Sequence, residues 1–140
     1  MGAYRQVLGR WGEDQAESYL VGLGYEILAR NVRTPYGEID LVARQVYGLE
    51  HGPEGPARVT VFVEVKTRAT TVYGLPEVSV TRRKQAHLLA SAQSYLQSHP
   101  DLDGDWRIDV IAVQRSPGRQ APDLHHFENA LSNMDLPGNR

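Results

Sequence analysis

Apolar side chains recur along the chain at two different spacings, and these spacings predict two helices and four or five strands. Helical spacing covers residues Tyr4 to Leu23, and also a second stretch that Thr81 can cap and that runs to about Ser98. Strand spacing is predicted at 25–32, 38–44, 58–67, 106–113 and, more weakly, 124–127. This order of elements predicts an α/β fold in which a mixed sheet of four to five strands is flanked by helices.

Segments rich in glycine and proline separate these elements. The run QVYGLEHGPEGPA, residues 45–57, has no apolar period and predicts a flexible hairpin loop between two strands. Gly74, Leu75 and Pro76 interrupt the pattern before the second helix. A chain of 140 residues can bury one core, so we expect a single domain over 1–130 and a loose C-terminal tail over 131–140.

The composition narrows the chemistry that the chain can perform. It contains no cysteine, so thiolate nucleophiles and cysteine zinc sites are excluded, and a metal would need carboxylates, carbonyls or histidines. No apolar run is long enough for a membrane span, and the first residues lack the apolar core of a signal peptide. We therefore expect a cytoplasmic protein without membrane contact.

Charge is unevenly distributed along the chain. The net charge of -2 argues against a general nucleic-acid coat, whose affinity comes from neutralising phosphates. Between Arg58 and Lys84, however, six side chains are basic and only Glu64 and Glu77 are acidic. A basic segment around a few carboxylates suits a protein that cuts phosphodiester bonds, because such a protein must bind backbone phosphates and also hold a cation.

Carboxylates interrupt two of the predicted strands. Successive side chains of a strand alternate between its faces, so Glu38 and Asp40 are expected on one face, opposite the apolar side chains at 39, 41 and 43. The same rule places Glu64 and Lys66 together on a strand that otherwise resembles a buried one. Burying such charges costs on the order of several kcal/mol unless they are paired or bound to a metal.

A metal site would explain these buried charges. If the hairpin brings Asp40 beside Glu64, their oxygens and the Val65 carbonyl are suited to one Mg²⁺ or Mn²⁺ ion, with water completing the shell. Lys66 would then lie beside the ion. It would orient or help to deprotonate the attacking water, or stabilise the charge that develops on the phosphate, and the sequence leaves these roles open.

Two segments carry a resemblance to a known family. GEIDLV (37–42) and FVEVKTR (62–68) together resemble the signature of PD-(D/E)xK nucleases. More closely, the chain is similar to the uncharacterised bacterial YraN-like family, itself similar to archaeal Holliday-junction resolvases. The similarity also includes GRWGEDQAESYL (9–20), GYEILARNVR (24–33), VTRRKQ (80–85), RIDVIAV (107–113) and HHFENAL (125–131). The chain departs from the broader signature in having Ile39-Asp40 where the name-giving Pro-Asp would stand.

The resemblance implies a restriction-endonuclease-like α-β-β-β-α-β core and a Mg²⁺ or Mn²⁺ ion held at Asp40 and Glu64. It also implies hydrolysis of phosphodiester bonds in branched or structured DNA, and a homodimer if a symmetric junction is cut at two points. In the related resolvases a glutamate on the first helix assists the metal site, and the match places this role on Glu13. The helical wheel independently favours Glu13 over Glu17, because Glu13 lies nearer to the buried face.

The start of the second helix and the end of the third strand supply the expected contacts to nucleic acid. Arg82, Arg83 and Lys84 lie in the first helical turn, where the helix dipole disfavours cations and a phosphate partner would reverse that effect. Gln85 is predicted to face inward, within reach of the scissile phosphate or of a metal-bound water. Arg68 is placed with the three basic residues as a candidate phosphate contact.

Plainer interpretations of these features remain open. The two carboxylates could pair with Lys66 and Arg68 as ordinary cross-strand ion pairs. Glu13 could be a solvent-facing helix residue, and the basic first turn of the second helix could simply be solvated. The five histidines show no zinc spacing and are assigned no role, while Trp11 and Trp106 are expected in the core.

Two other classes of function also remain. The chain could be a non-catalytic module that keeps the nuclease fold and binds nucleic acid or a protein without cutting. It could also be an accessory subunit whose site is completed by another protein. Metal-dependent cleavage by the isolated chain would distinguish the nuclease from both.

Overall fold

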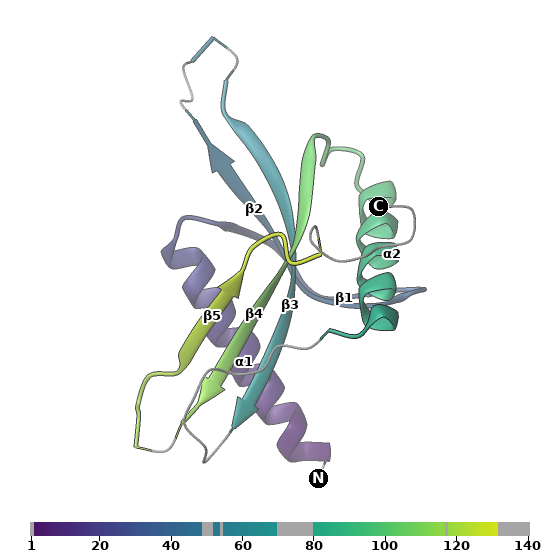
Figure 1. Ribbon diagram of the computed structural model, residues 1–140. Helices are drawn as coiled ribbons and strands as arrows, with labels where there is room; N and C mark the ends of the chain where they lie inside the picture. The colour runs from purple at the N-terminus through teal and green to yellow at the C-terminus, as the bar shows by residue number, and fades with distance from the viewer. Residues whose placement is uncertain (1, 49–51, 54, 70–79, 117, 132–140) are drawn as a thin grey trace.

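The computed structural model describes residues 2–48, 52–53, 55–69, 80–116 and 118–131 (Figure 1). Its elements are α1 (Gly2–Gly22), β1 (Glu26–Thr34), β2 (Gly37–Tyr47), β3 (Ala57–Ala69), α2 (Arg82–Ser98), β4 (Asp105–Arg115) and β5 (Asp123–Phe127). The predicted order of elements and the predicted fold class are confirmed. None of the helices in the described ranges is long and apolar enough to cross a membrane.

The strands form one five-stranded sheet in the order β1-β2-β3-β4-β5. Neighbouring strands are antiparallel except β3 and β4, which run parallel. A parallel pair needs a crossover connection, and α2 lies in the segment that joins these two strands (Figure 1). Helices α1 and α2 pack against opposite faces of the sheet, so the fold has three layers.

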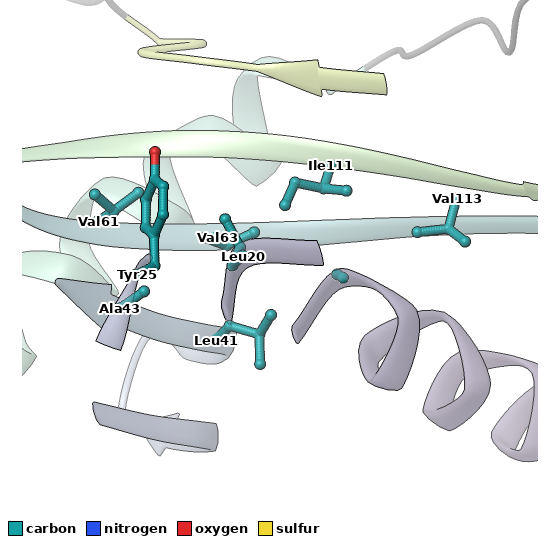
Figure 2. Packing of buried hydrophobic residues seen from close by; sticks show 9 residues of the cluster. Leu20, Tyr25, Leu41, Ala43, Val61, Val63, Ile111 and Val113 are labelled. Carbon is teal, nitrogen blue, oxygen red and sulfur yellow. The ribbon is translucent and has the colours of Figure 1, made fainter. Parts of the chain in front are cut away.

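One core lies between α1 and the sheet (Figure 2). Ala16 and Leu20 of α1 pack against alternate residues of the three central strands. The strand residues of this core are Leu41, Ala43, Val61, Val63, Ile111 and Val113. Tyr25 fills one end of it and points its hydroxyl toward β4, where Arg107 donates a hydrogen bond of 2.9 Å (Figure 2).

The second core lies between α2 and the other face of the sheet. Its buried residues are Ile39, Val42, Phe62, Leu88, Ala92, Tyr95, Ile108 and Leu131. Phe62 meets Tyr95 and Trp106 edge to face, with ring centroids 5.8 and 5.9 Å apart. Trp106 packs on this core and Trp11 packs on the α1 core, as the sequence predicted for both tryptophans.

The β2–β3 hairpin is longer than predicted, which corrects the loop assigned to 45–57. Strand β2 continues to Tyr47 and β3 begins at Ala57, and these two residues are opposite one another in the ladder. Two strands can continue to pair through their main chains beyond the part whose one face is buried. The sequence of such an exposed extension need not alternate between apolar and polar residues, so the pattern does not predict it. The predicted loop therefore shrinks at both ends.

Other predicted boundaries have different outcomes. Thr81 caps α2 as predicted, because its hydroxyl accepts a hydrogen bond from the Lys84 N–H at 3.1 Å. The predicted break at 74–76 and residues 132–140 of the predicted tail lie outside the described residues. Leu131, the first residue of that predicted tail, is buried in the α2 core.

Strand β2 changes the direction of its side chains at Asp40. Leu41 faces the α1 core, whereas Ile39 faces the α2 core, so the prediction that both share one face is wrong. Asn31 lies in β1 between the partners of these two residues and has a left-handed φ of 53°. Ile39 and its β1 partner Val32 both face the α2 core, so the alternation is broken in both strands beside Asn31.

Helix α1 packs directly on β3 at Gly12, which is buried. A Cβ atom at this position would overlap Thr67 Oγ1 and lie 2.7 Å from Thr67 Cγ2. Glycine is thus required here by the close approach of the helix to the sheet. The same approach brings the next residue, Glu13, toward the sheet.

Replacing Gly12 by alanine is expected to lower the free energy of unfolding by about 1–3 kcal/mol, because the added methyl group forces α1 away from β3. Gly9 is the matched control, since an added Cβ there has no described atom within 4 Å. Gly9→Ala is expected to raise the free energy by about 0.5–1 kcal/mol. Urea denaturation followed by circular dichroism measures both, and effects of equal sign would contradict this account.

Candidate active site

Asp40 lies where β2 and β3 part. The two strands pair in regular antiparallel register as far as Leu41 opposite Val63. One step further, Asp40 Oδ2 accepts a hydrogen bond from the backbone N–H of Val65 at 2.7 Å. The side chain of Asp40 takes the place of a main-chain acceptor, so the sheet itself fixes the position of this carboxylate.

Glu64 precedes Val65 on β3, and its side chain is only 7% exposed. Its Oε1 lies 3.7 Å from Lys66 Nζ and 3.5 Å from Lys84 Nζ. Its Oε2 is buried and has no hydrogen-bond partner among the described residues. A buried carboxylate oxygen without a donor is unfavourable, so this atom is suited to a cation or a donor from outside the protein.

The surroundings of Asp40 favour its protonated form. Burial is the largest cause that raises the pKa of Asp40, and the negative charge of Glu64 is the second. The hydrogen bond from Val65 and the charge of Lys84 act in the opposite direction, while the charge of Glu13 adds to the rise. Together these influences raise the pKa of Asp40 to about 7. A pair of buried carboxylates of this kind binds a proton near neutral pH, and a cation can displace that proton.

Glu13 approaches the site from α1. Its side chain is largely buried, and its Oε1 lies 3.4 Å from a guanidinium nitrogen of Arg30 without forming a hydrogen bond to any described residue. Arg30 is itself held by Asp14 at 2.7 Å. Glu13 therefore lies at the edge of the buried face, as the helical wheel predicted, and its charge acts on Asp40.

The predicted nucleic-acid contacts fall into two groups. Arg68, at the end of β3, and Arg82 and Arg83, at the start of α2, are exposed. Lys84 had been grouped with them, but its ammonium group points to Glu64. The structure therefore adds Lys84 to the carboxylate cluster, which the sequence did not predict.

Two side-chain hydrogen bonds fix the first turn of α2. One is the cap from Thr81, and in the other Gln85 Nε2 donates to the Val80 carbonyl at 2.8 Å. Gln85 is buried, so it faces inward as predicted, and its amide group stabilises the start of the helix. These bonds position the turn from which Lys84 reaches Glu64.

A second buried carboxylate, Asp109 on β4, was not identified from the sequence. It accepts hydrogen bonds from Arg107 at 2.9 Å, from His126 Nε2 at 2.7 Å and from the Asn129 backbone N–H at 2.9 Å. Burial alone would raise the pKa of Asp109. The hydrogen bonds from His126 and Arg107 outweigh burial and hold the pKa of Asp109 below its usual value.

His126, to which the sequence assigned no role, joins Asp109 to α1. Its Nδ1 lies 3.1 Å from the hydroxyl of Tyr19. Part of this cluster had a signal in the sequence, because Arg107 and Asp109 are two residues apart on a strand and must share a face. The contact with β5 had no such signal, since strand order does not follow from local alternation.

The two buried acidic clusters differ in how their charge is compensated. Asp109 has donors for both oxygens and a lowered pKa, which is what a structural ion pair requires. Asp40 and Glu64 repel one another, the pKa of Asp40 is raised, and one Glu64 oxygen has no donor in the described structure. Carboxylates of this second kind are typical of active sites. The candidate site is therefore the cluster of Asp40, Glu64, Lys66 and Lys84, with Glu13 at its edge.

The donor atoms of this cluster fit a hard divalent cation. In the described part of the chain, no three His, Cys, Asp or Glu side chains form a metal-binding group by themselves. Mg²⁺, however, commonly binds one or two carboxylates and completes its octahedron with other oxygens. The N–H and C=O of one strand residue point to the same side, so the Val65 carbonyl faces the side on which Asp40 lies. Asp40, Glu64 and Val65 can thus supply the three predicted ligands.

Comparisons with known proteins match the chain to an uncharacterised group. The family model described as "Uncharacterised protein family UPF0102" matches residues 12–113. A UPF0102 protein of Dehalococcoides mccartyi is 43% identical over 127 residues, which are 91% of this chain and 94% of that protein. A UPF0102 protein of Geobacter sulfurreducens is 41% identical over 129 residues, 91% of each chain. One from Clavibacter michiganensis is 45% identical over 115 residues, 82% of this chain and 88% of its own.

The raised pKa of Asp40 predicts a pH dependence of stability. The folded state binds this proton more tightly than the unfolded chain, so the contribution of Asp40 to the free energy of unfolding falls as pH rises from about 4 to about 7. Asp40→Asn removes this titration. The variant should therefore gain stability relative to the wild type across this window, as measured by urea denaturation. Glu38→Gln, an exposed carboxylate on the same strand, is the control and should show no such trend.

The cluster around Asp109, in which both carboxylate oxygens have donors, predicts a different change in stability when its charge is removed. Asp109→Asn leaves the shape of the side chain but removes the counter-charge of Arg107, and we expect a loss of about 3 kcal/mol in the free energy of unfolding. Asp123 pairs with Arg119 at 2.9 Å on the surface, so Asp123→Asn should cost less than about 1 kcal/mol. Thermal or urea denaturation compares the two variants, and similar small losses in both would contradict a structural role for Asp109.

Proposed function

The chain belongs to the uncharacterised protein family UPF0102, and we propose that it is a divalent-metal-dependent endonuclease that hydrolyses phosphodiester bonds of DNA. In this proposal Asp40, Glu64 and Lys66 carry the chemistry, and Glu13 assists from α1. The observation that supports it most directly is the repulsive carboxylate pair, in which Asp40 has a pKa of about 7 and Glu64 Oε2 has no partner among the described residues.

The use of lysine in this chain supports the same assignment. Of 15 basic residues only Lys66 and Lys84 are lysines, and the ammonium groups of both lie within 3.7 Å of Glu64 Oε1. Arginine supplies the structural and surface charges elsewhere, for example at Arg107. Lysine differs from arginine in being a compact point charge that can take part in proton transfer. Its restriction to this cluster favours a chemical role over a general electrostatic one.

A Mg²⁺ or Mn²⁺ ion is the cofactor that this donor set fits. Asp40, Glu64 and the Val65 carbonyl would hold it, and a cation would relieve both the repulsion at Asp40 and the missing partner of Glu64. When bound, the ion supplies positive charge to the phosphate and lowers the pKa of water for attack. Glu13 adds a further negative charge at the edge of the same site.

Lys66 and Lys84 have room to act on the substrate. Their side chains are 31% and 39% exposed, so each ammonium group reaches both Glu64 and solvent. One ammonium group is sufficient to balance the charge of Glu64. The other can orient the attacking water or stabilise the charge that develops on the phosphoryl oxygens.

The exposed arginines supply contacts to the DNA backbone. Arg68 lies at the end of the strand that carries Glu64, and Arg82 and Arg83 lie beside Lys84, so all three belong to elements of the candidate site. The choice of branched or structured DNA rests on the resemblance to Holliday-junction resolvases and thus on analogy. Cutting a symmetric junction at two points would require a homodimer.

The proposal predicts metal-dependent cleavage in a labelled panel of linear duplex, single strand, flap and four-way junction. With Mg²⁺ or Mn²⁺ we expect cutting, with a preference for the branched substrates. Asp40→Asn and Lys66→Ala should lower the rate by at least about 10²-fold, as loss of a metal ligand or of a proton-transfer group does. Lys84→Ala should lower it by a similar factor if the second ammonium group acts on substrate.

The control for this experiment is Glu38→Gln, which changes an exposed carboxylate two residues from Asp40 and should leave the rate unchanged. Binding of the panel without cleavage under either metal would refute the nuclease and favour the non-catalytic module. Cleavage that persists in Asp40→Asn would show that the activity does not come from this site.

A further inference from the structure

A cavity of about 730 Å³ lies between the first turns of α1 and the end of β3. Its lining includes Tyr4, Leu8 and Val65, which are aromatic or aliphatic, and the basic residues Arg5 and Arg68. The described residues that line it include these two arginines and no acidic side chain. Its volume falls within the range of about 300–1,000 Å³ that is usual for pockets of small ligands.

The cavity adjoins the candidate active site through one residue. The side chain of Val65 forms part of the cavity wall, and the backbone N–H of Val65 donates to Asp40. Val65 thus places the cavity next to the candidate site along β3, on the side of the strand that α1 covers.

We propose that this cavity binds an unpaired nucleotide of the strand being cut, with the base against Tyr4 and its flanking phosphates on Arg5 and Arg68. The inference rests on the proposed nuclease function and adds a reason for its substrate choice. A base inside a duplex has both faces covered by its neighbours and cannot stack on a protein side chain. Only DNA with an unpaired base beside the cut, as at a flap or junction, can occupy the cavity.

The chemistry of the cavity favours a nucleotide over a second copy of this chain. Tyr4 is 63% exposed, so its ring is available for stacking. An isologous dimer through this face would bring Arg5 and Arg68 of one copy toward the same residues of the other copy, without acidic partners among the described lining residues. A nucleotide offers an aromatic face and negative phosphates, which match both kinds of wall.

Equilibrium binding tests the inference without requiring cleavage. The probe is a short fluorescein-labelled single-stranded oligonucleotide, compared with the same strand annealed to its complement, in the absence of divalent metal. Tyr4→Ala is expected to weaken single-strand binding about tenfold and to leave duplex binding unchanged, since loss of one stacking contact has effects of this order. Tyr4→Phe should retain binding, because phenylalanine can still stack.

The matched control is Tyr36→Ala, which removes a tyrosine of similar exposure, 54%, at the β1–β2 turn and should change neither affinity. Arg5→Gln and Arg68→Gln should each reduce the slope of log affinity against log salt by about 0.7, the value for one single-strand phosphate. Circular dichroism confirms that the variants fold.

The outcomes separate this inference from the proposed function. Single-strand binding by Tyr4→Ala at wild-type strength, or an equal loss for duplex, overturns the inference even if Asp40-dependent cleavage is observed. A change in sedimentation of Tyr4→Ala from dimer to monomer, with unchanged oligonucleotide binding, also overturns it and assigns the cavity to a second copy. Tyr4-dependent single-strand binding without cleavage of any substrate refutes the nuclease and leaves the cavity as the nucleotide site of a protein that binds without cutting.

Discussion

The hydrogen bond from the Val65 N–H to the carboxylate of Asp40 is the contact on which the candidate site depends. Strand pairing ends at this point, and the side chain of Asp40 satisfies a donor that β2 no longer reaches. The backbone thereby places Asp40 beside Glu64, although the two charges repel one another. Burial and the charge of Glu64 raise the pKa of Asp40 to about 7, so this arrangement favours a bound proton on Asp40. The sheet therefore holds the two carboxylates side by side, and both ammonium groups of the cluster lie at Glu64.

The topology of the sheet brings the other layers to this point. Because β3 and β4 are parallel, the chain must cross over between them, and α2 is part of this crossover. The first turn of α2 lies close enough to β3 for Lys84 to reach Glu64. On the opposite face, the missing side chain of Gly12 lets α1 approach β3, so that Glu13 lies near Asp40. The site thus forms where both helices meet the end of the β2–β3 pairing, and each helix contributes one charged residue to it.

The helical and strand spacing of the sequence was sufficient to predict much of this arrangement, and it failed at a few residues that can be named. Helical and strand spacing predicted the order of elements, the Thr81 cap and the common face of Glu64 and Lys66, because these depend only on neighbours in sequence. Ile39 was placed on the wrong face because the alternation is broken beside Asn31, where the backbone takes a left-handed conformation that side-chain spacing does not reveal. The contacts of Lys84 with Glu64 and of His126 with Asp109 were not predictable, since helical and strand periods determine a face and not the partner that it meets.

The donors that pair with the buried carboxylate of Asp109 affect how the chain folds during translation. Arg107 lies two residues before it, but its donors on His126 and Asn129 are 17 and 20 residues further along the chain. As the nascent chain leaves the ribosome, β4 emerges before those donors do, and burying the half-paired carboxylate at that stage is unfavourable. Burial of Asp109 is therefore favourable only after β5 has followed β4 out of the ribosome. A chain that terminates prematurely within β4 or the following loop would stay open and accessible to the proteases that remove incompletely folded products.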